Sequence, residues 1–162
     1  MWKRRTFHDC AHELLQISDR FRLAANGEFG INSTGVMTET SVRGVEILRI
    51  LSLSVRSEQD YGLTDGRKLD VGILVSDPDA IEITEAIRDR RVTVPNKPLT
   101  LRDGLNKIAH ADPTRSTYRL DPTDHVLVLI SDRGERWIVE LSIPKLCSAI
   151  LQLKDRAIKM ST

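Results

Sequence analysis

The spacing of the apolar residues changes near Pro113, and this change constrains the fold more than any other feature of the sequence. Before Pro113 the apolar residues recur mostly at steps of three and four, which is the period of amphipathic helices. From residue 116 to residue 141 they follow a period of two, which is typical of strands. The sequence therefore predicts an α+β fold, with a mainly helical bundle in residues 1–112, followed in residues 113–162 by a small antiparallel three-strand meander and a final helix.

Helical periodicity predicts four helices before Pro113, over residues 7–25, 39–56, 77–90 and 101–111. The helix over residues 39–56 carries apolar residues on more than one face, as expected for a helix that is buried on two sides and paired with the first. Residues 27–38 are rich in Gly, Asn, Ser and Thr, and we expect a loop there. The apolar run 71–75 is too short to distinguish a strand from a helix, and its type stays open.

Three strands are predicted over residues 116–120, 125–130 and 136–141, with turns at residues 121–124 and 132–135. The run Val126–Ile130 lacks alternation, so we expect it in the middle of the sheet, covered on both faces. Trp137 alternates with Val139 and is expected in the core. Pro144 begins the final helix, whose apolar stripe consists of Leu146, Ile150, Leu153, Ala157 and Ile158.

The composition fits one globular domain. The 162 residues include 24 Lys and Arg against 23 Asp and Glu, and the net charge of +1 argues against a protein that coats nucleic acid by long-range attraction alone. The longest uncharged apolar run is Val126–Ile130, whereas a spanning helix needs roughly 18 residues, so we expect no membrane association. Cys10 and Cys147 have no CxxC partner, which indicates reduced, buried thiols and a cytoplasmic protein.

The helix predicted over residues 101–111 carries the side chains best suited to chemistry. Its apolar side, which begins with Leu101 and Leu105, should face the core. Steps of four residues place a polar ridge on the opposite side, formed by Arg102, Asn106 and His110. An imidazole can move protons near neutral pH, a guanidinium can stabilise a phosphorane, and an amide can hold a phosphate or the imidazole in place. The ridge therefore suits RNA cleavage, although a histidine that caps the helix end fits the same spacing.

Residues 99–112, LTLRDGLNKIAHAD, resemble the signature helix of the HEPN superfamily, whose helical domains are often RNases, toxins or proteins of phage defence and RNA processing. The family pattern is very often written Arg-Asn-x-x-x-His, and the segment Asn106–His110 reproduces its Asn and His. Leu105 stands where the pattern has Arg, and the nearest upstream arginine is Arg102. The resemblance implies a HEPN-like fold and a metal-independent endoribonuclease without a cofactor. It also implies a homodimer, in which two motif helices build one composite cleft.

The resemblance also assigns roles to individual residues. His110 would be the catalytic acid or base, Asn106 would orient the site, and Arg102 would supply the family arginine from one turn further back. We further predict that Lys107 and Arg115 contact the RNA. The resemblance places such a protein in a bacterial defence or toxin–antitoxin system, with a protein partner in some cases.

Two readings without catalysis stay open. In one, the chain is a HEPN-like module that dimerises or binds a partner, and His110 and Asn106 have structural roles. In the other, it is a small antitoxin-like or immunity-type protein whose meander edge pairs with another chain. His8 and His12 stand four residues apart and can share a helix face, but no third ligand follows at a typical distance. This favours a solvated helix over a zinc site.

Overall fold

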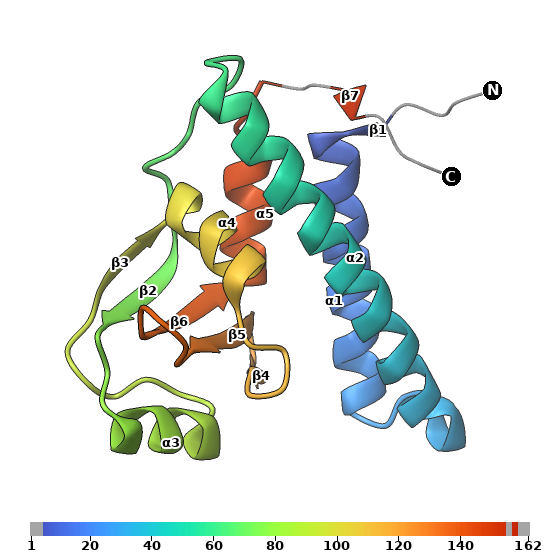
Figure 1. The fold of residues 1–162 in the computed structure, drawn as a ribbon. Coiled ribbons are helices and arrows are strands. Elements are labelled where there is room, and N and C mark those ends of the chain that lie inside the picture. Colours follow the sequence, from blue (N-terminus) through green and yellow to red (C-terminus); the bar gives the residue numbers. More distant parts are fainter. Residues whose placement is uncertain (1–4, 155–156, 159–162) are drawn as a thin grey trace.

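The computed structural model describes residues 5–154 and 157–158, so that residues 1–4, 155–156 and 159–162 lie outside the described part of the chain (Figure 1). Its helices are α1 (Phe7–Ala25), α2 (Ser33–Asp60), α3 (Ala80–Asp89), α4 (Leu101–His110) and α5 (Ile143–Leu151), and a 3-10 turn, η1, covers Gly30–Asn32. Its strands are β1 (Arg5–Thr6), β2 (Asp70–Ser76), β3 (Lys97–Thr100), β4 (Thr117–Asp121), β5 (Asp124–Ser131), β6 (Trp137–Ser142) and β7 (Ala157–Ile158).

The main sheet has five antiparallel strands in the order β3-β2-β6-β5-β4. The predicted strands β4, β5 and β6 are confirmed, and the fold class is α+β. The expectation that the sheet is only a three-strand meander after residue 112 was wrong. Two earlier strands extend it, because β2 pairs with β6 and β3 pairs with β2. The apolar run 71–75 forms most of β2. Proline is unfavourable in most strands because it has no amide hydrogen to donate to a neighbouring strand. Pro98 is tolerated because β3 lies at the edge of the sheet.

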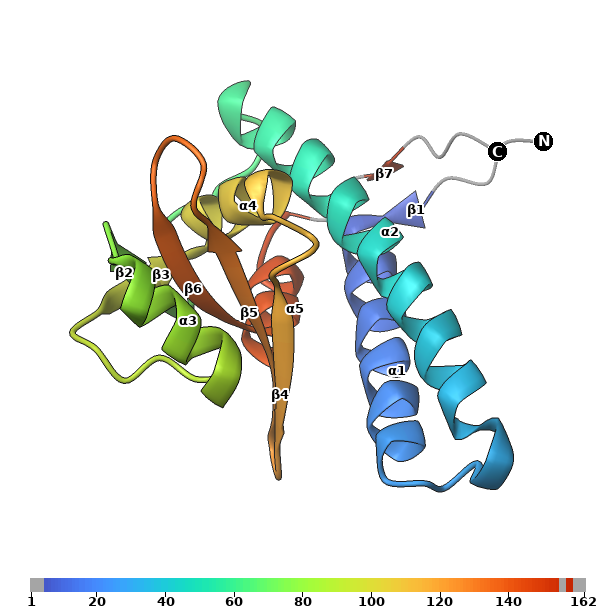
Figure 2. The same cartoon turned by 60° about the horizontal axis from the view of Figure 1, so that its bottom comes forward.

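Helices cover both faces of the sheet. One face packs against α4, α5 and the α1–α2 hairpin in the larger apolar core, to which β6 contributes Trp137, Val139 and Leu141. The opposite face packs against α3, where Ile83 and Ala86 meet alternate residues of β5 and β6. Figure 2 shows α3 and α5 on opposite sides of the strands. The expectations that β5 is covered on both faces and that Trp137 is a core residue are confirmed.

The hairpin of α1 and α2 forms a long arm beside the sheet (Figures 1 and 2). Helix α1 has the predicted bounds, and a capping box between Thr6 and Asp9 satisfies its first amides. Helix α2 starts at Ser33, so part of the expected loop is helical. The expectation that α2 is buried on two sides is confirmed in part, because α2 packs against α1 and also against α4. Val42 and Leu53 are 59% and 68% exposed and lie on a side of α2 that neither helix covers.

The end of the chain differs from the expected long final helix. Helix α5 begins with the predicted Pro144 in its first turn and ends at Leu151. Residues Ala157–Ile158 instead form β7, which pairs with β1. The charged run 154–156 interrupts the apolar stripe in the sequence, so a longer helix would bring charges toward the core. None of the helices in the described part of the chain combines the length and apolarity needed to cross a bilayer.

Candidate functional site

Helix α4 is held firmly against the sheet by its apolar side. Leu101 and Leu105 are fully buried, as the periodicity predicts. The Leu101 amide donates a 2.7 Å hydrogen bond to the Leu69 carbonyl, and the Thr100 hydroxyl accepts one from the Asp103 amide. A Cβ atom added at Gly104 would lie 3.0 Å from the Val71 side chain, so the helix packs tightly on β2. This docking directs the polar ridge of α4 away from the core.

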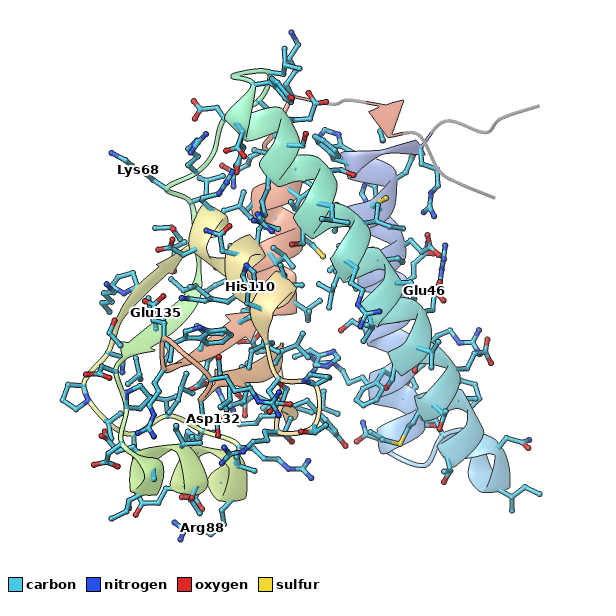
Figure 3. All side chains as sticks on the ribbon, viewed as in Figure 1. Glu46, Lys68, Arg88, His110, Asp132 and Glu135 are labelled. Carbon is cyan, nitrogen blue, oxygen red and sulfur yellow. The ribbon has the colours of Figure 1, made fainter. Side chains whose placement is uncertain are left out.

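The polar side of α4 lines a pocket of about 930 Å³. The other walls come from α2, from residues 111–114 and from the β5–β6 hairpin. Figure 3 labels His110 at the end of α4, with Asp132 and Glu135 on that hairpin. The pocket brings together four of the predicted site residues, namely Arg102, Asn106, Lys107 and His110. The wall outside α4 includes two further arginines, Arg56 and Arg133.

Arg102 anchors α4 to the end of α2. One guanidinium nitrogen, Nη1, donates to the Arg56 carbonyl at 3.1 Å and lies 2.9 Å from Oδ1 of Asp60. The hydrogen bond from Arg102 holds the pKa of the Asp60 carboxyl below its usual range, so this ion pair persists at neutral pH. Arg102 is therefore partly committed to a structural contact between two helices, although it also lines the pocket.

Two buried polar atoms in the pocket wall have no hydrogen-bond partner among the described residues: Oδ1 of Asn106 and Nε of Arg56. Buried polar atoms are nearly always hydrogen-bonded, to protein, water or a ligand. The pair offers one acceptor and one donor. Both atoms are closed off from solvent, so the Asn106 and Arg56 side chains must turn before these atoms can contact a ligand in the pocket.

Lys107 lies against an aromatic ring of the pocket wall. Its Nζ is 4.8 Å from the ring centroid of Trp137, a cation–π distance. Trp137 is buried as predicted, yet it also reaches the pocket. The ring restricts the ammonium to one side of the pocket, where it can meet a phosphate.

Arg115 is placed differently from the other predicted residues. It does not line the pocket; it forms an ion pair with Asp132, which does. Asp112, a second pocket carboxylate, accepts hydrogen bonds from the Thr114 hydroxyl and amide, which lower the pKa of Asp112. Both of these carboxylates thus have partners, and Glu135 is a third acidic residue in the pocket wall. The prediction that Arg115 binds RNA stays a prediction. Its ion pair with Asp132 ties the segment after α4 to the β5–β6 hairpin.

The remaining sequence candidates lie elsewhere. Nε2 of His8 lies 3.0 Å from the Leu153 carbonyl, and the described residues contain no group of three or more His, Cys, Asp or Glu suited to a metal. Cys10 and Cys147 are buried, and burial raises the pKa of Cys147 to about 12. The Cys147 thiol therefore stays protonated at neutral pH, and a nucleophilic role is excluded for it.

A buried histidine that sequence reasoning missed lies between the α1–α2 arm and the sheet. Nδ1 of His125 is 2.8 Å from the Ser18 hydroxyl, and the ring stacks on Phe21 at 5.2 Å. The side chain is 8% exposed, and this burial lowers the pKa of His125 to about 4. The ring is therefore neutral at pH 7. No periodicity marks this contact, because it joins residues 107 positions apart.

We expect His125 to make the fold less stable at acid pH. The unfolded chain binds a proton near pH 6.5 and the folded chain only near pH 4, so stability falls as the pH drops through this window. At pH 4.5 the loss relative to pH 7 is about 2–3 kcal/mol, at about 1.4 kcal/mol per pKa unit. Urea denaturation at both pH values measures it. His125→Asn should lose about 2 kcal/mol less than wild type between these pH values, and equal losses would contradict the assignment.

Comparison of the chain with protein-family models, with curated proteins and with solved structures gave no match. Membership of the HEPN superfamily therefore stays a prediction.

Proposed function

We propose that this chain is a HEPN-like, metal-independent endoribonuclease of a bacterial defence or toxin-type system, and that the pocket beside α4 is its RNA site. The observation that carries the proposal is the meeting of Asn106, Lys107 and His110 with Arg56 and Arg133 in one pocket. Phosphate contacts from Lys and Arg supply most of the affinity of proteins for nucleic acids. An exposed imidazole at the end of the same helix adds a group that transfers protons near neutral pH.

The pocket atoms match the groups of a phosphodiester and its ribose. Lys107, Arg56 and Arg133 would neutralise the phosphate, and Asn106, once its side chain turns toward the pocket, would accept a hydrogen bond from a ribose hydroxyl at its unpaired Oδ1. The 2′-oxygen then bonds to phosphorus while its proton passes to His110. The bond from phosphorus to the 5′-oxygen breaks, and that oxygen takes up a proton. The products are a 2′,3′-cyclic phosphate and a 5′-hydroxyl end.

The reaction needs one group to accept a proton and one to donate a proton. His110 supplies the first, and the second can come from its imidazolium form, from water or from His110 of a second copy. The homodimer implied by the resemblance would provide that second imidazole. An excess of inactive variant mixed with wild type would then lower the activity per wild-type chain.

Replacing His110 by alanine should lower RNA cleavage in the presence of EDTA by at least about 100-fold, since positioned acid–base groups contribute about 10²–10⁴-fold. The side chain is exposed, so the melting temperature should stay unchanged. Cleavage of a labelled single-stranded RNA, with analysis of the product ends, measures the effect. His12→Ala, at an exposed histidine of α1, is the matched control and should cleave like wild type. Absence of cleavage by wild type, or equal cleavage by His110→Ala, would contradict the proposal.

A second candidate function is a non-catalytic module of the antitoxin or immunity type that binds RNA or a protein partner. The contact that favours it is the ion pair of Arg102 with Asp60, because this guanidinium is already engaged away from a bound phosphate. Leu105 occupies the position of the family arginine and is buried in the core. RNA binding by a wild-type protein that produces no cyclic phosphate ends would support this candidate.

A further inference from the structure

We infer that an apolar groove beside the pocket receives a nucleobase next to the bound phosphate, so that the site takes single-stranded RNA. This inference rests on the proposed RNA site. The groove has a volume of about 520 Å³ and lies between α2, the end of α4, and β4 with β5. Leu53 of α2, Ile108 of α4 and Leu129 of β5 form three of its apolar walls, and Tyr118 of β4 adds an aromatic ring.

The groove adjoins the pocket. Ala111 and Pro113 line both, directly after the end of α4. Ala109 lines the groove and its neighbour His110 lines the pocket, so the last turn of α4 forms the ridge between them. A strand whose phosphate lies beside His110 therefore needs only to pass this ridge to place its next base in the groove.

The charges along α2 fit a strand that crosses from one hollow to the other. Arg49 lines the groove and Arg56 lines the pocket. Seven residues separate them, so they share a helix face and stand about 10 Å apart along the axis. Among the described residues that line the groove, none is acidic. The groove thus suits a ligand in which anionic groups and apolar rings lie close together, as the phosphates and bases of a nucleotide strand do.

The surface of the groove also suits a flat ring with a polar edge. Val45 and Leu53 are 45% and 68% exposed, so a base that covers them removes apolar surface from water. Ser116 and Thr117 line the same groove and can bond to base edges. Single strands are typically bound by this combination of cations along the backbone and apolar or aromatic contacts to the bases.

Binding of two fluorescent strands by anisotropy tests the inference. One is a five-nucleotide 2′-O-methyl RNA, which cannot be cleaved because the attacking hydroxyl is blocked, and the other is the same backbone with abasic residues. Stacking of one base contributes about 1–3 kcal/mol, so wild type should bind the complete RNA at least about fivefold more tightly. The double variant Val45→Gln/Leu53→Gln should reduce this preference to less than about threefold, with unchanged binding of the abasic strand.

Ile31→Gln/Val42→Gln is the matched control, because both residues are exposed on the α1–α2 arm and neither lines the groove. It should keep the wild-type preference. Equal binding of both strands by wild type would overturn the base site while the phosphate site stands, and binding of neither strand would overturn both. Light scattering adds a third outcome: a lower molar mass for Val45→Gln/Leu53→Gln than for wild type would assign the groove to a second copy and overturn the inference.

Discussion

Replacement of Gly72 by alanine is expected to destabilise the fold by about 4 kcal/mol or more, which is a large fraction of the roughly 5–15 kcal/mol that stabilises a typical domain. Gly72 lies in β2, and it pairs with Leu99 of β3 on one side and Leu141 of β6 on the other. A Cβ atom at this position would lie 1.9 Å from the Glu140 carbonyl oxygen. That oxygen belongs to the backbone of the central strand, so it cannot move away without breaking the sheet.

The yield of folded protein and the midpoint of urea denaturation measure this effect. Gly35→Ala is the matched control, because Gly35 lies in α2 and a Cβ atom there meets nothing within 4 Å. Alanine favours a helix over glycine by up to about 1 kcal/mol, so this variant should be as stable as wild type or slightly more stable. If Gly72→Ala unfolded at the same urea concentration as Gly35→Ala, the pairing of β2 with β6 would be incorrect.

Replacement of Glu140 by alanine is expected to cost about 3 kcal/mol. Glu140 is 8% exposed on the α3 side of the sheet. Its Oε1 lies 2.5 Å from Nη2 of Arg119, and its Oε2 accepts a 2.9 Å hydrogen bond from the Val92 amide. Loss of one partner of a buried ion pair typically costs about 3–5 kcal/mol, and the lower end applies because Asp121 also pairs with Arg119.

The Glu140 contacts also hold the loop after α3. Nη1 of Arg119 donates to the Arg90 carbonyl at 2.8 Å, so one buried carboxylate connects the sheet to residues 90–92. Urea denaturation of Glu140→Ala and Glu140→Gln separates charge from shape, since the amide keeps the size of the side chain. We expect a smaller loss for Glu140→Gln. A loss below about 0.5 kcal/mol for Glu140→Ala would mean that the ion pair contributes little to stability.

The parts of the fold that were predictable are those with local signals. Helix α4 has an apolar period and a capping threonine within its own sequence, and β4, β5 and β6 are apolar segments separated by marked turns. Strands β2 and β3 lack such signals, because β2 is a short apolar run and β3 contains Pro98. Their strand conformation depends on pairing with each other and, for β2, with β6. No local pattern in the sequence encodes that pairing.

The candidate site divides in the same way. Arg102, Asn106 and His110 were predictable as a group because one helix period brings them together, and all three line the pocket. Arg56 and Arg133 come from α2 and the β5–β6 hairpin, and only the tertiary fold places them beside α4. The contact of Arg102 with Asp60 was likewise invisible in the sequence, since it depends on where α2 ends.

The most direct test of the RNA site is an amide chemical-shift titration of the isotopically labelled protein with the uncleavable five-nucleotide RNA. We expect the largest shifts in residues 102–114 and 131–135, which surround the pocket, with little change in α3. His110→Ala should keep most of these shifts, because the cations of the pocket remain. Shifts confined to α3 or to the tip of the α1–α2 arm, or no shifts at millimolar RNA, would contradict an RNA site beside α4.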